Sequence, residues 1–283
     1  MLEGFTPWPA ELAARYRERG YWRDEPLGDI VDRGADRFGQ REALTNGTER
    51  ITYMELKRRV DRLALHLLDL GLGPRDRVVV QLHNTPEFVF LYFACTKIGA
   101  LPIMALLPHR LMEISYLAGF SEATAYAGPT RLRGFDYQQL ARQVRSTTPT
   151  LRLILAAGDN ADPDMISLTE LLGDGIEERE PAATLAQFRP DASEVALFLL
   201  SGGTTGLPKL IPRTHNDYEY NSRASGAACD IGPDTVYMAV LPVAHNFALA
   251  SPGLQSVLQV GGRVCSPTRR TPQTRFSSSS RSA

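Results

Sequence analysis

One nine-residue stretch concentrates the residue types that bind phosphate groups. It reads Ser201-Gly202-Gly203-Thr204-Thr205-Gly206-Leu207-Pro208-Lys209 and follows the apolar segment 195–200, which has the composition of a buried strand. Glycines let a loop turn several backbone N–H groups toward one point, hydroxyls add further donors, and lysine adds a mobile positive charge. The stretch therefore predicts a loop that binds a polyphosphate. The alternative is a flexible surface loop in which Lys209 is an ordinary solvated lysine.

The phosphate loop of nucleotide hydrolases is a different motif. It requires Gly-Lys-Ser/Thr in direct succession at the start of a helix. Here Leu207 and Pro208 separate Gly206 from Lys209, and Leu210 stands where the metal-binding hydroxyl would be. The spacing excludes that class of loop.

A second group of polar residues follows the dipeptide Leu241-Pro242. His245 can donate hydrogen bonds to carboxylate or phosphate oxygens, and its neighbour Asn246 is polar without charge. Ser251 stands before Pro252. These residues are therefore candidates for contacting an anionic ligand. The alternative is that their roles are structural, with His245 packed at the end of a strand and Ser251 capping a helix.

Composition narrows the classes of partner. The 283 residues include 31 Lys plus Arg and 32 Asp plus Glu, so no basic excess indicates nucleic acid or an anionic membrane. The three cysteines and the remaining histidines show no metal-ligand spacing, so no metal site is expected among them. No apolar run reaches membrane-spanning length and no signal peptide is evident, so we expect a cytoplasmic protein.

Apolar periodicity predicts alternating strands and helices. Helices are expected over residues 52–70, 85–99 and 135–144, and strands over 77–82, 101–106, 151–157 and 195–200. Such alternation is typical of an α/β fold, with parallel strands and helices on both faces. Residues 158–192 are rich in Asp, Glu, Gly and Pro and are expected to form an exposed connection.

The last residues differ from the rest. Residues 265–283 have no apolar period and no acidic residue, and Ser, Thr, Arg and Pro dominate them. This composition predicts a disordered tail. We hypothesise that a reading-frame change or a premature end replaced the native continuation.

Taken together, the motifs resemble those of the adenylate-forming (AMP-binding) ligase superfamily, which includes acyl-CoA synthetases, luciferases and peptide-synthetase adenylation domains. Within it the chain is most similar to the stand-alone 2,3-dihydroxybenzoate–AMP ligases, the aryl-acid activating enzymes of siderophore pathways. The resemblance extends from residue 1 to about residue 264. It rests on the segments 4–9 (GFTPWP), 76–82 (DRVVVQL), 109–110 (HR), 134–137 (GFDY), 200–206 (LSGGTTG), 209–215 (KLIPRTH) and 241–247 (LPVAHNF).

The resemblance implies a fold and a reaction. Residues 1–264 would form part of the large N-terminal AMP-binding domain, with parallel sheets sandwiched by helices and the C-terminal lid domain absent. The complete enzyme would use ATP with Mg²⁺ to convert 2,3-dihydroxybenzoate or salicylate into an aryl-adenylate and pyrophosphate. The acyl group would then pass to the thiol of an aryl carrier protein.

The resemblance also implies residue roles. His245 would be the catalytic residue, positioning the carboxylate and the α-phosphate. Asn246 and Ser251 would contact the aryl acid, since amino-acid activating relatives usually have an aspartate at the first position to pair with the substrate ammonium. Ala248 replaces a proline common in the family. The ATP phosphates would be bound by Ser201, Gly202, Gly203, Thr204, Thr205, Gly206 and Lys209.

The segments that follow in the family are missing from this sequence. They include the adenine-binding segment, the aspartate that binds the ribose and the lid with its catalytic lysine. We therefore expect this chain alone to be incomplete and inactive. The alternatives are a fragment of an acyl-CoA synthetase and a non-catalytic remnant that binds a ligand or a partner.

Overall fold

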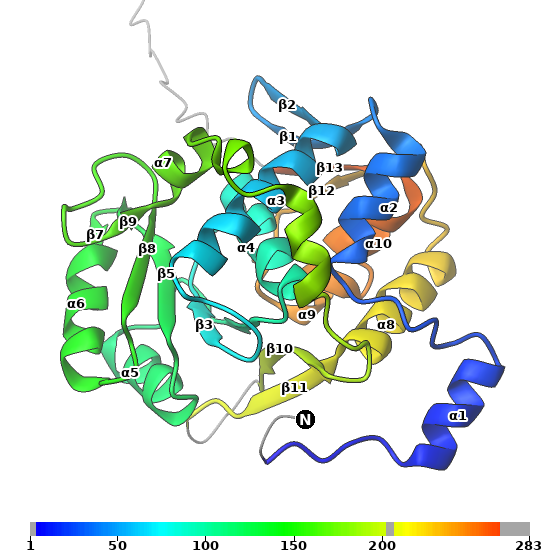
Figure 1. The fold of residues 1–283 in the computed structure, drawn as a ribbon, viewed down its shortest axis with the longest axis horizontal. Coiled ribbons are helices and arrows are strands. Elements are labelled where there is room, and N and C mark those ends of the chain that lie inside the picture. Colours follow the sequence, from blue (N-terminus) through cyan, green and yellow to red (C-terminus); the bar gives the residue numbers. More distant parts are fainter. Residues whose placement is uncertain (1–3, 202–206, 267–283) are drawn as a thin grey trace, which may run out of the picture.

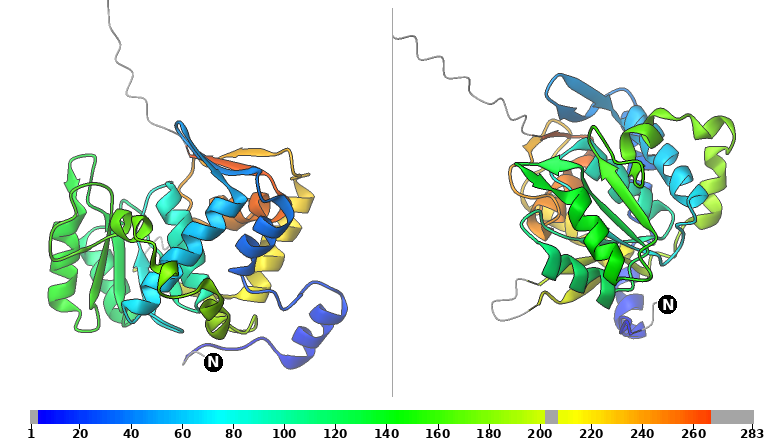
Figure 2. Two further views of the ribbon diagram at one scale, coloured as in Figure 1. Left: turned by 45° about the horizontal axis from the view of Figure 1, so that its top comes forward. Right: turned by 90° about the vertical axis from the view of Figure 1, so that its left-hand side faces the viewer.

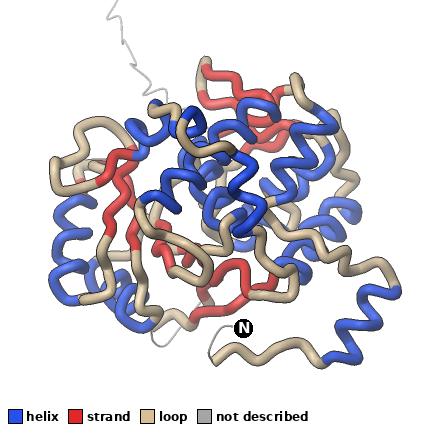
Figure 3. Tube along the Cα trace, in the orientation of Figure 1, coloured by secondary structure: helices blue, strands red, loops and turns tan. Residues whose placement is uncertain are grey.

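The computed structural model describes residues 4–201 and 207–266 (Figure 1). The predicted phosphate ligands Gly202, Gly203, Thr204, Thr205 and Gly206 and the tail from residue 267 lie outside the described residues. The described part contains two larger sheets and one two-stranded sheet with helices packed around them, and Figure 3 separates these helices and strands by colour. The α/β class predicted from the sequence is confirmed.

The larger sheet contains seven strands. Neighbouring strands run parallel except for the pair at one edge, β11 and β10, which is antiparallel. In spatial order the strands are β11 (Leu210–Thr214), β10 (Val195–Leu200), β4 (Leu101–Met104), β3 (Arg77–Val80), β5 (Ala125–Pro129), β8 (Leu153–Ala157) and β9 (Ile166–Ser167).

Helices cover both faces of this sheet. Successive side chains of a strand point to opposite faces. Accordingly, Val78 and Val80 belong to the core that includes α3 (Tyr53–Asp69) and α4 (Pro86–Lys97). Val79 between them belongs to the core that includes α5 (Leu111–Phe120) and α6 (Tyr137–Thr147).

Local signals set the ends of these helices. The Thr52 hydroxyl accepts the N–H of Glu55 at 3.2 Å, which confirms the predicted start of α3. Pro86 occupies the first turn of α4, as predicted. The helix predicted from residue 135 begins two residues later, because β7 (Phe135–Asp136) pairs with β6 (Arg131–Leu132) and Asp136 caps α6.

The connection expected at 158–192 is largely exposed, as predicted, but it contains regular structure that was not predicted. It contains β9, α7 (Leu168–Gly173) and the 3₁₀ helices η1 (Ile176–Glu178) and η2 (Ala182–Phe188), which lie against α3. Leu168, Ile176 and Leu185 are buried in the same core as α3. Isolated apolar residues spaced eight or nine apart give no clear period, so periodicity could not predict that these three residues are buried.

A four-stranded sheet packs beside the first. Its order is β12 (Val236–Met238), β13 (Arg263–Ser266), β1 (Glu42–Asn46) and β2 (Glu49–Thr52). β13 extends to Ser266, past the predicted domain boundary at 264. Helices α2 (Asp29–Phe38), α8 (His215–Ala228) and α10 (Leu254–Val260) lie next to one another in this part of the molecule.

The N-terminal helix is set apart. Helix α1 (Ala10–Glu18) has no buried residue and lies beside the body of the molecule in both views of Figure 2. Aromatic contacts anchor this segment, because Trp8 packs edge-on against Trp22 and Tyr21 stacks on Tyr220 of α8 at 4.9 Å between ring centroids.

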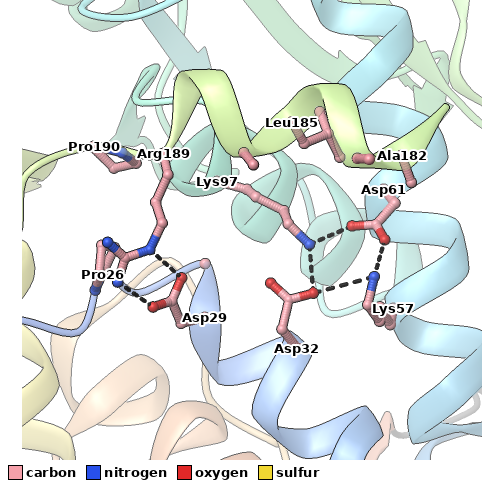
Figure 4. Close-up of a pocket in the computed structure, with 13 residues that line it drawn as sticks. Pro26, Asp29, Asp32, Lys57, Asp61, Lys97, Ala182, Leu185, Arg189 and Pro190 are labelled. Carbon is pink, nitrogen blue, oxygen red and sulfur yellow. Dashed lines mark hydrogen bonds and ion pairs between the residues drawn. The ribbon is translucent and has the colours of Figure 1, made fainter. Parts of the chain in front are cut away.

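Charged side chains connect helices α2, α3 and α4 at the C-terminal end of α4 (Figure 4). Lys97 contacts Asp32 of α2 at 2.7 Å and also Asp61 of α3. Lys57 of α3 contacts the same two aspartates, at 3.2 Å for Asp32. The two lysines and two aspartates form a closed, charge-balanced cluster that lines a cavity of about 370 Å³.

Candidate active site

A second cavity lies at the carboxyl edge of the larger sheet. Strands β4 and β10 are parallel neighbours, with Ile103 opposite Phe198, so the segments that follow them lie at the same edge. Such edges are where open α/β sheets bind ligands. The cavity has a volume of about 510 Å³, and Ala244, His245 and Asn246 at the start of α9 (Asn246–Ala250) form part of its wall. Its polar lining residues are Ser201, Arg213, His109, Glu113, His245 and Asn246.

The two ends of the predicted phosphate loop are bonded to each other. The Ser201 N–H donates to the Lys209 carbonyl at 3.0 Å, and the Ser201 hydroxyl accepts the Lys209 N–H at 2.9 Å. Lys209 is exposed, and in the part of the chain that the structure describes no carboxylate pairs with it. The Lys209 charge is therefore available to a ligand beside the two ends of the loop. The phosphate-binding roles stay predictions.

His245 lies in the cavity wall as the N-cap residue of α9. Its Nδ1 accepts the backbone N–H of Phe247 at 3.3 Å, so in the neutral ring the proton is on Nε2. The side chain is exposed rather than packed at a strand end. This arrangement leaves Nε2–H as a hydrogen-bond donor for a ligand.

Asn246 presents an unused acceptor. Its side-chain oxygen is buried and, within the described part of the chain, has no hydrogen-bond partner. A buried polar atom without a partner costs about 1–3 kcal/mol. A ligand hydroxyl that donated to this oxygen would remove that cost.

Ser251 lies apart from these residues. Its hydroxyl accepts a hydrogen bond from the Asn221 amide at 2.6 Å, at the contact between α8 and the end of α9. It does not line the cavity that contains His245 and Asn246. Its predicted contact with an aryl acid stays a prediction.

Three lining residues were not predicted as site residues. Arg213 on β11 pairs with Asp217 at 2.5 Å and lies over the ring of Tyr218. His109 lies in the turn after β4, and Glu113 lies in the first turn of α5, the next helix. The rule that carboxyl ends of adjacent parallel strands share an edge is the signal that finds them.

Burial affects the titration of His109. The ring is half-buried, and this burial lowers its pKa, while the neighbouring Glu113 carboxylate acts in the opposite direction. His109 is therefore a neutral imidazole near pH 7.

Among residues 4–201 and 207–266, no three His, Cys, Asp or Glu side chains come together as metal ligands. A search of the same residues for a helix of the length and apolarity that a bilayer crossing requires found none.

Two comparisons with known proteins concern sequence. The chain is 48% identical over 271 residues to a salicylyl-CoA synthase / salicylate adenylyltransferase from a Streptomyces species, covering 96% of this chain and 49% of that protein. It is 45% identical over 276 residues to the 2,3-dihydroxybenzoate-AMP ligase of Bacillus subtilis, covering 98% and 49%. The chain thus spans about half the length of the curated relatives it matches.

A third comparison concerns structure. The apo structure of MbtA from Mycobacterium smegmatis matches with a TM-score of 0.83 and 41% sequence identity, over 93% of this chain and 47% of that one. The family model for AMP-binding enzymes matches residues 31–278. These matches and the fold confirm the predicted family, and the chain belongs to the AMP-binding enzymes.

Proposed function

We propose that this chain forms the phosphate- and aryl-acid-binding part of an enzyme that activates 2,3-dihydroxybenzoate or salicylate with ATP. A carboxylate oxygen of the acid attacks the α-phosphorus, forming the aryl-adenylate and releasing pyrophosphate. The aryl group then passes to a carrier-protein thiol for siderophore biosynthesis. The observation that supports this best is the orphaned buried oxygen of Asn246, in a cavity that also includes Ser201 and His245.

The chemistry requires charge neutralisation, because both reactants are anions. Lys209 supplies positive charge at the end of the loop that begins at Ser201, beside the departing pyrophosphate. His245 Nε2–H donates to the carboxylate or to an α-phosphate oxygen and thereby aligns the two reactants, without itself transferring a proton. We expect Mg²⁺ to enter with ATP, since it commonly binds through substrate phosphates.

Asn246 would select the acid. Its free oxygen accepts a hydrogen bond, which suits a hydroxyl ortho to the carboxylate, as in salicylate and 2,3-dihydroxybenzoate. It offers no negative charge to a substrate ammonium, so amino acids would be bound poorly. The names of the Streptomyces and Bacillus relatives specify these same two acids.

Two other functions have support. The Streptomyces relative is named a salicylyl-CoA synthase, which favours coenzyme A as an alternative acceptor of the aryl group. A protein that binds the acid without activating it is the other candidate, since the free Asn246 oxygen needs only a hydroxyl donor. We propose that the chain alone binds aryl acid weakly and does not form the adenylate.

Ligand-observed NMR titrations with salicylate and with benzoate test the proposal. Asn246→Leu should weaken salicylate binding about tenfold and leave benzoate, which lacks the hydroxyl, unchanged. Gln143→Leu is the control, because Gln143 carries an exposed amide on helix α6 and lies outside the cavity. Equal affinities of wild type for both acids would contradict the role of Asn246. Pyrophosphate exchange by this chain alone would contradict its proposed inactivity.

A further inference from the structure

His109 belongs to a segment that is held unusually firmly. Gln81, fully buried at the end of β3, donates from its amide nitrogen to the carbonyls of Leu106 and His109, each at 2.9 Å. The Gln81 oxygen accepts the Tyr126 hydroxyl at 2.7 Å. One buried side chain thus fixes both ends of the turn 106–109.

The turn also fixes the imidazole of His109. The backbone N–H of His109 donates to the Leu106 carbonyl at 3.0 Å, which closes the turn. In return, the Leu106 N–H donates to His109 Nδ1 at 3.1 Å. Because Nδ1 is an acceptor here, the proton of the neutral ring must be on Nε2.

Arg110 holds the segment from the other side. Its guanidinium lies 4.2 Å from the ring centroid of Phe135 and donates to the carbonyls of Leu107 and His109. The Tyr137 hydroxyl donates to the same Leu107 carbonyl at 3.1 Å. The side chains of Gln81, Arg110 and Tyr137 therefore hold the backbone on both sides of His109 in place.

The only ring nitrogen of His109 without a partner, within the described part of the chain, is Nε2. Since His109 lines the cavity, this nitrogen is available there to a ligand. The cavity then presents two histidines whose Nδ1 accepts a backbone N–H and whose Nε2–H can donate, His109 and His245, and one free acceptor, Asn246. A carboxylate with an ortho hydroxyl has the complementary pattern of acceptors and a donor.

We propose that His109 is a ligand-binding residue whose Nε2–H donates to a carboxylate oxygen of the bound aryl acid. This inference rests on the proposed function. It gives His109 a role in holding the carboxylate, whereas Asn246 recognises the ortho hydroxyl. The Gln81, Arg110 and Tyr137 contacts preorganise the donor.

Two substitutions separate the two nitrogens of His109. His109→Asn places an oxygen near Nδ1, which keeps the acceptor for the Leu106 N–H but removes the Nε2 donor. His109→Gln places an amide N–H near Nε2, which keeps the donor but removes the bond to Leu106. We expect His109→Asn to weaken both salicylate and benzoate binding about tenfold with an unchanged unfolding midpoint. We expect His109→Gln to lower the midpoint and to weaken binding less than threefold.

The ligand pair distinguishes this inference from the proposed function. Loss of benzoate affinity in His109→Asn, but not in Asn246→Leu, supports a contact with the carboxylate. If wild type binds both acids and His109→Asn binds them equally well, the proposed role of His109 is wrong, whereas the proposed function stands. If wild type binds neither acid, the proposed function fails and this inference fails with it.

A spectroscopic readout adds an independent check. The ¹⁵N spectrum of the imidazoles should show His109 protonated at Nε2, and salicylate should shift that resonance. The buried His215, outside the cavity, is the internal control. A His109 signal that does not move at saturating salicylate contradicts the inference.

Discussion

The side-chain oxygen of Asn84 accepts the backbone N–H of Val243 at 3.0 Å, across 159 positions of sequence. The Asn84 amide nitrogen donates to the carbonyls of Ala239 at 2.6 Å and Leu241 at 2.8 Å. Asn84 follows β3, whereas residues 239–243 link β12 to His245. A single side chain therefore ties the seven-stranded sheet to the segment that positions His245 and Asn246.

Asn84→Ala should loosen that segment. The substitution leaves three backbone groups without their partner, and we expect a loss of about 1–3 kcal/mol in the free energy of unfolding. Because His245 and Asn246 directly follow the segment, salicylate affinity should fall as well. Urea unfolding and NMR titration measure the two effects. Wild-type affinity in a destabilised Asn84→Ala protein would show that Asn84 does not position the site.

The local structure was predictable where the signal was local. The Thr52 cap, the proline at the start of α4 and the apolar strand 195–200 each occupy adjacent positions, and the structure confirms the corresponding elements. The site was predictable only in part. Gln81 and Asn84 act on backbone groups between 25 and 159 residues away, so no sequence window contains both partners. His109 was missed because its role depends on which strands are neighbours in the sheet.

The ion-pair cluster of α2, α3 and α4 predicts a change in stability without a change in binding. Lys97→Met leaves Asp61, whose side chain is 7% exposed, with Lys57 as its remaining partner in the cluster. We expect the free energy of unfolding to fall by about 2–3 kcal/mol. Breaking an isolated buried pair costs about 3–5 kcal/mol, and the loss here is smaller because Lys57 remains. Adding Asp61→Leu should restore part of it, since the double variant is charge-balanced again.

The ion-pair cluster lies away from the candidate site, so Lys97→Met also serves as a control for the binding measurements. Lys97 ends α4, whereas the segment 81–85 before α4 lies at the opposite end, toward the candidate site. Salicylate affinity of folded Lys97→Met should therefore equal that of wild type. A fall in affinity at temperatures where the variant is fully folded would contradict this separation.

His215 predicts a dependence of stability on pH. Burial lowers its pKa to about 3; its Nδ1 accepts the Leu27 N–H at 3.1 Å, and its Nε2 is buried without a partner in the described residues. Between this pKa and the ordinary value of 6.5, the unfolded chain binds a proton that the folded chain does not. The free energy of unfolding should therefore fall as pH drops, by about 1.5–2 kcal/mol from pH 6.5 to pH 5.

His215→Asn isolates this contribution. The Asn oxygen can still accept the Leu27 N–H, but the side chain does not titrate. Carboxylates add their own acid dependence to both proteins, so the informative quantity is the difference between wild type and variant. That difference should change with pH below 6.5 and stay constant above 7. A constant difference over the whole range would mean that His215 is protonated equally in both states.

Gly253 predicts a steric link between α9 and α10. A Cβ at this position would lie 2.1 Å from the carbonyl oxygen of Ala248 and 2.7 Å from the carbonyl carbon of Leu249, so the backbone itself must shift. Asn246 begins the same short helix that contains Ala248 and Leu249. Gly253→Ala should therefore displace α9, destabilise the fold and weaken salicylate binding more than benzoate binding.

Gly119→Ala is the matched control for that substitution. Gly119 lies in the last turn of α5, and apart from its chain neighbours and the helix's own nearby backbone no described atom lies within 4 Å of the position its Cβ would take. Alanine is favoured over glycine by about 0.5–1 kcal/mol inside a helix and by less in its last turn, so this variant should be no less stable than wild type and bind normally. Thermal unfolding and the two titrations compare the pair. Equal salicylate affinities in Gly253→Ala and Gly119→Ala would show that the α9–α10 corner does not set the position of Asn246.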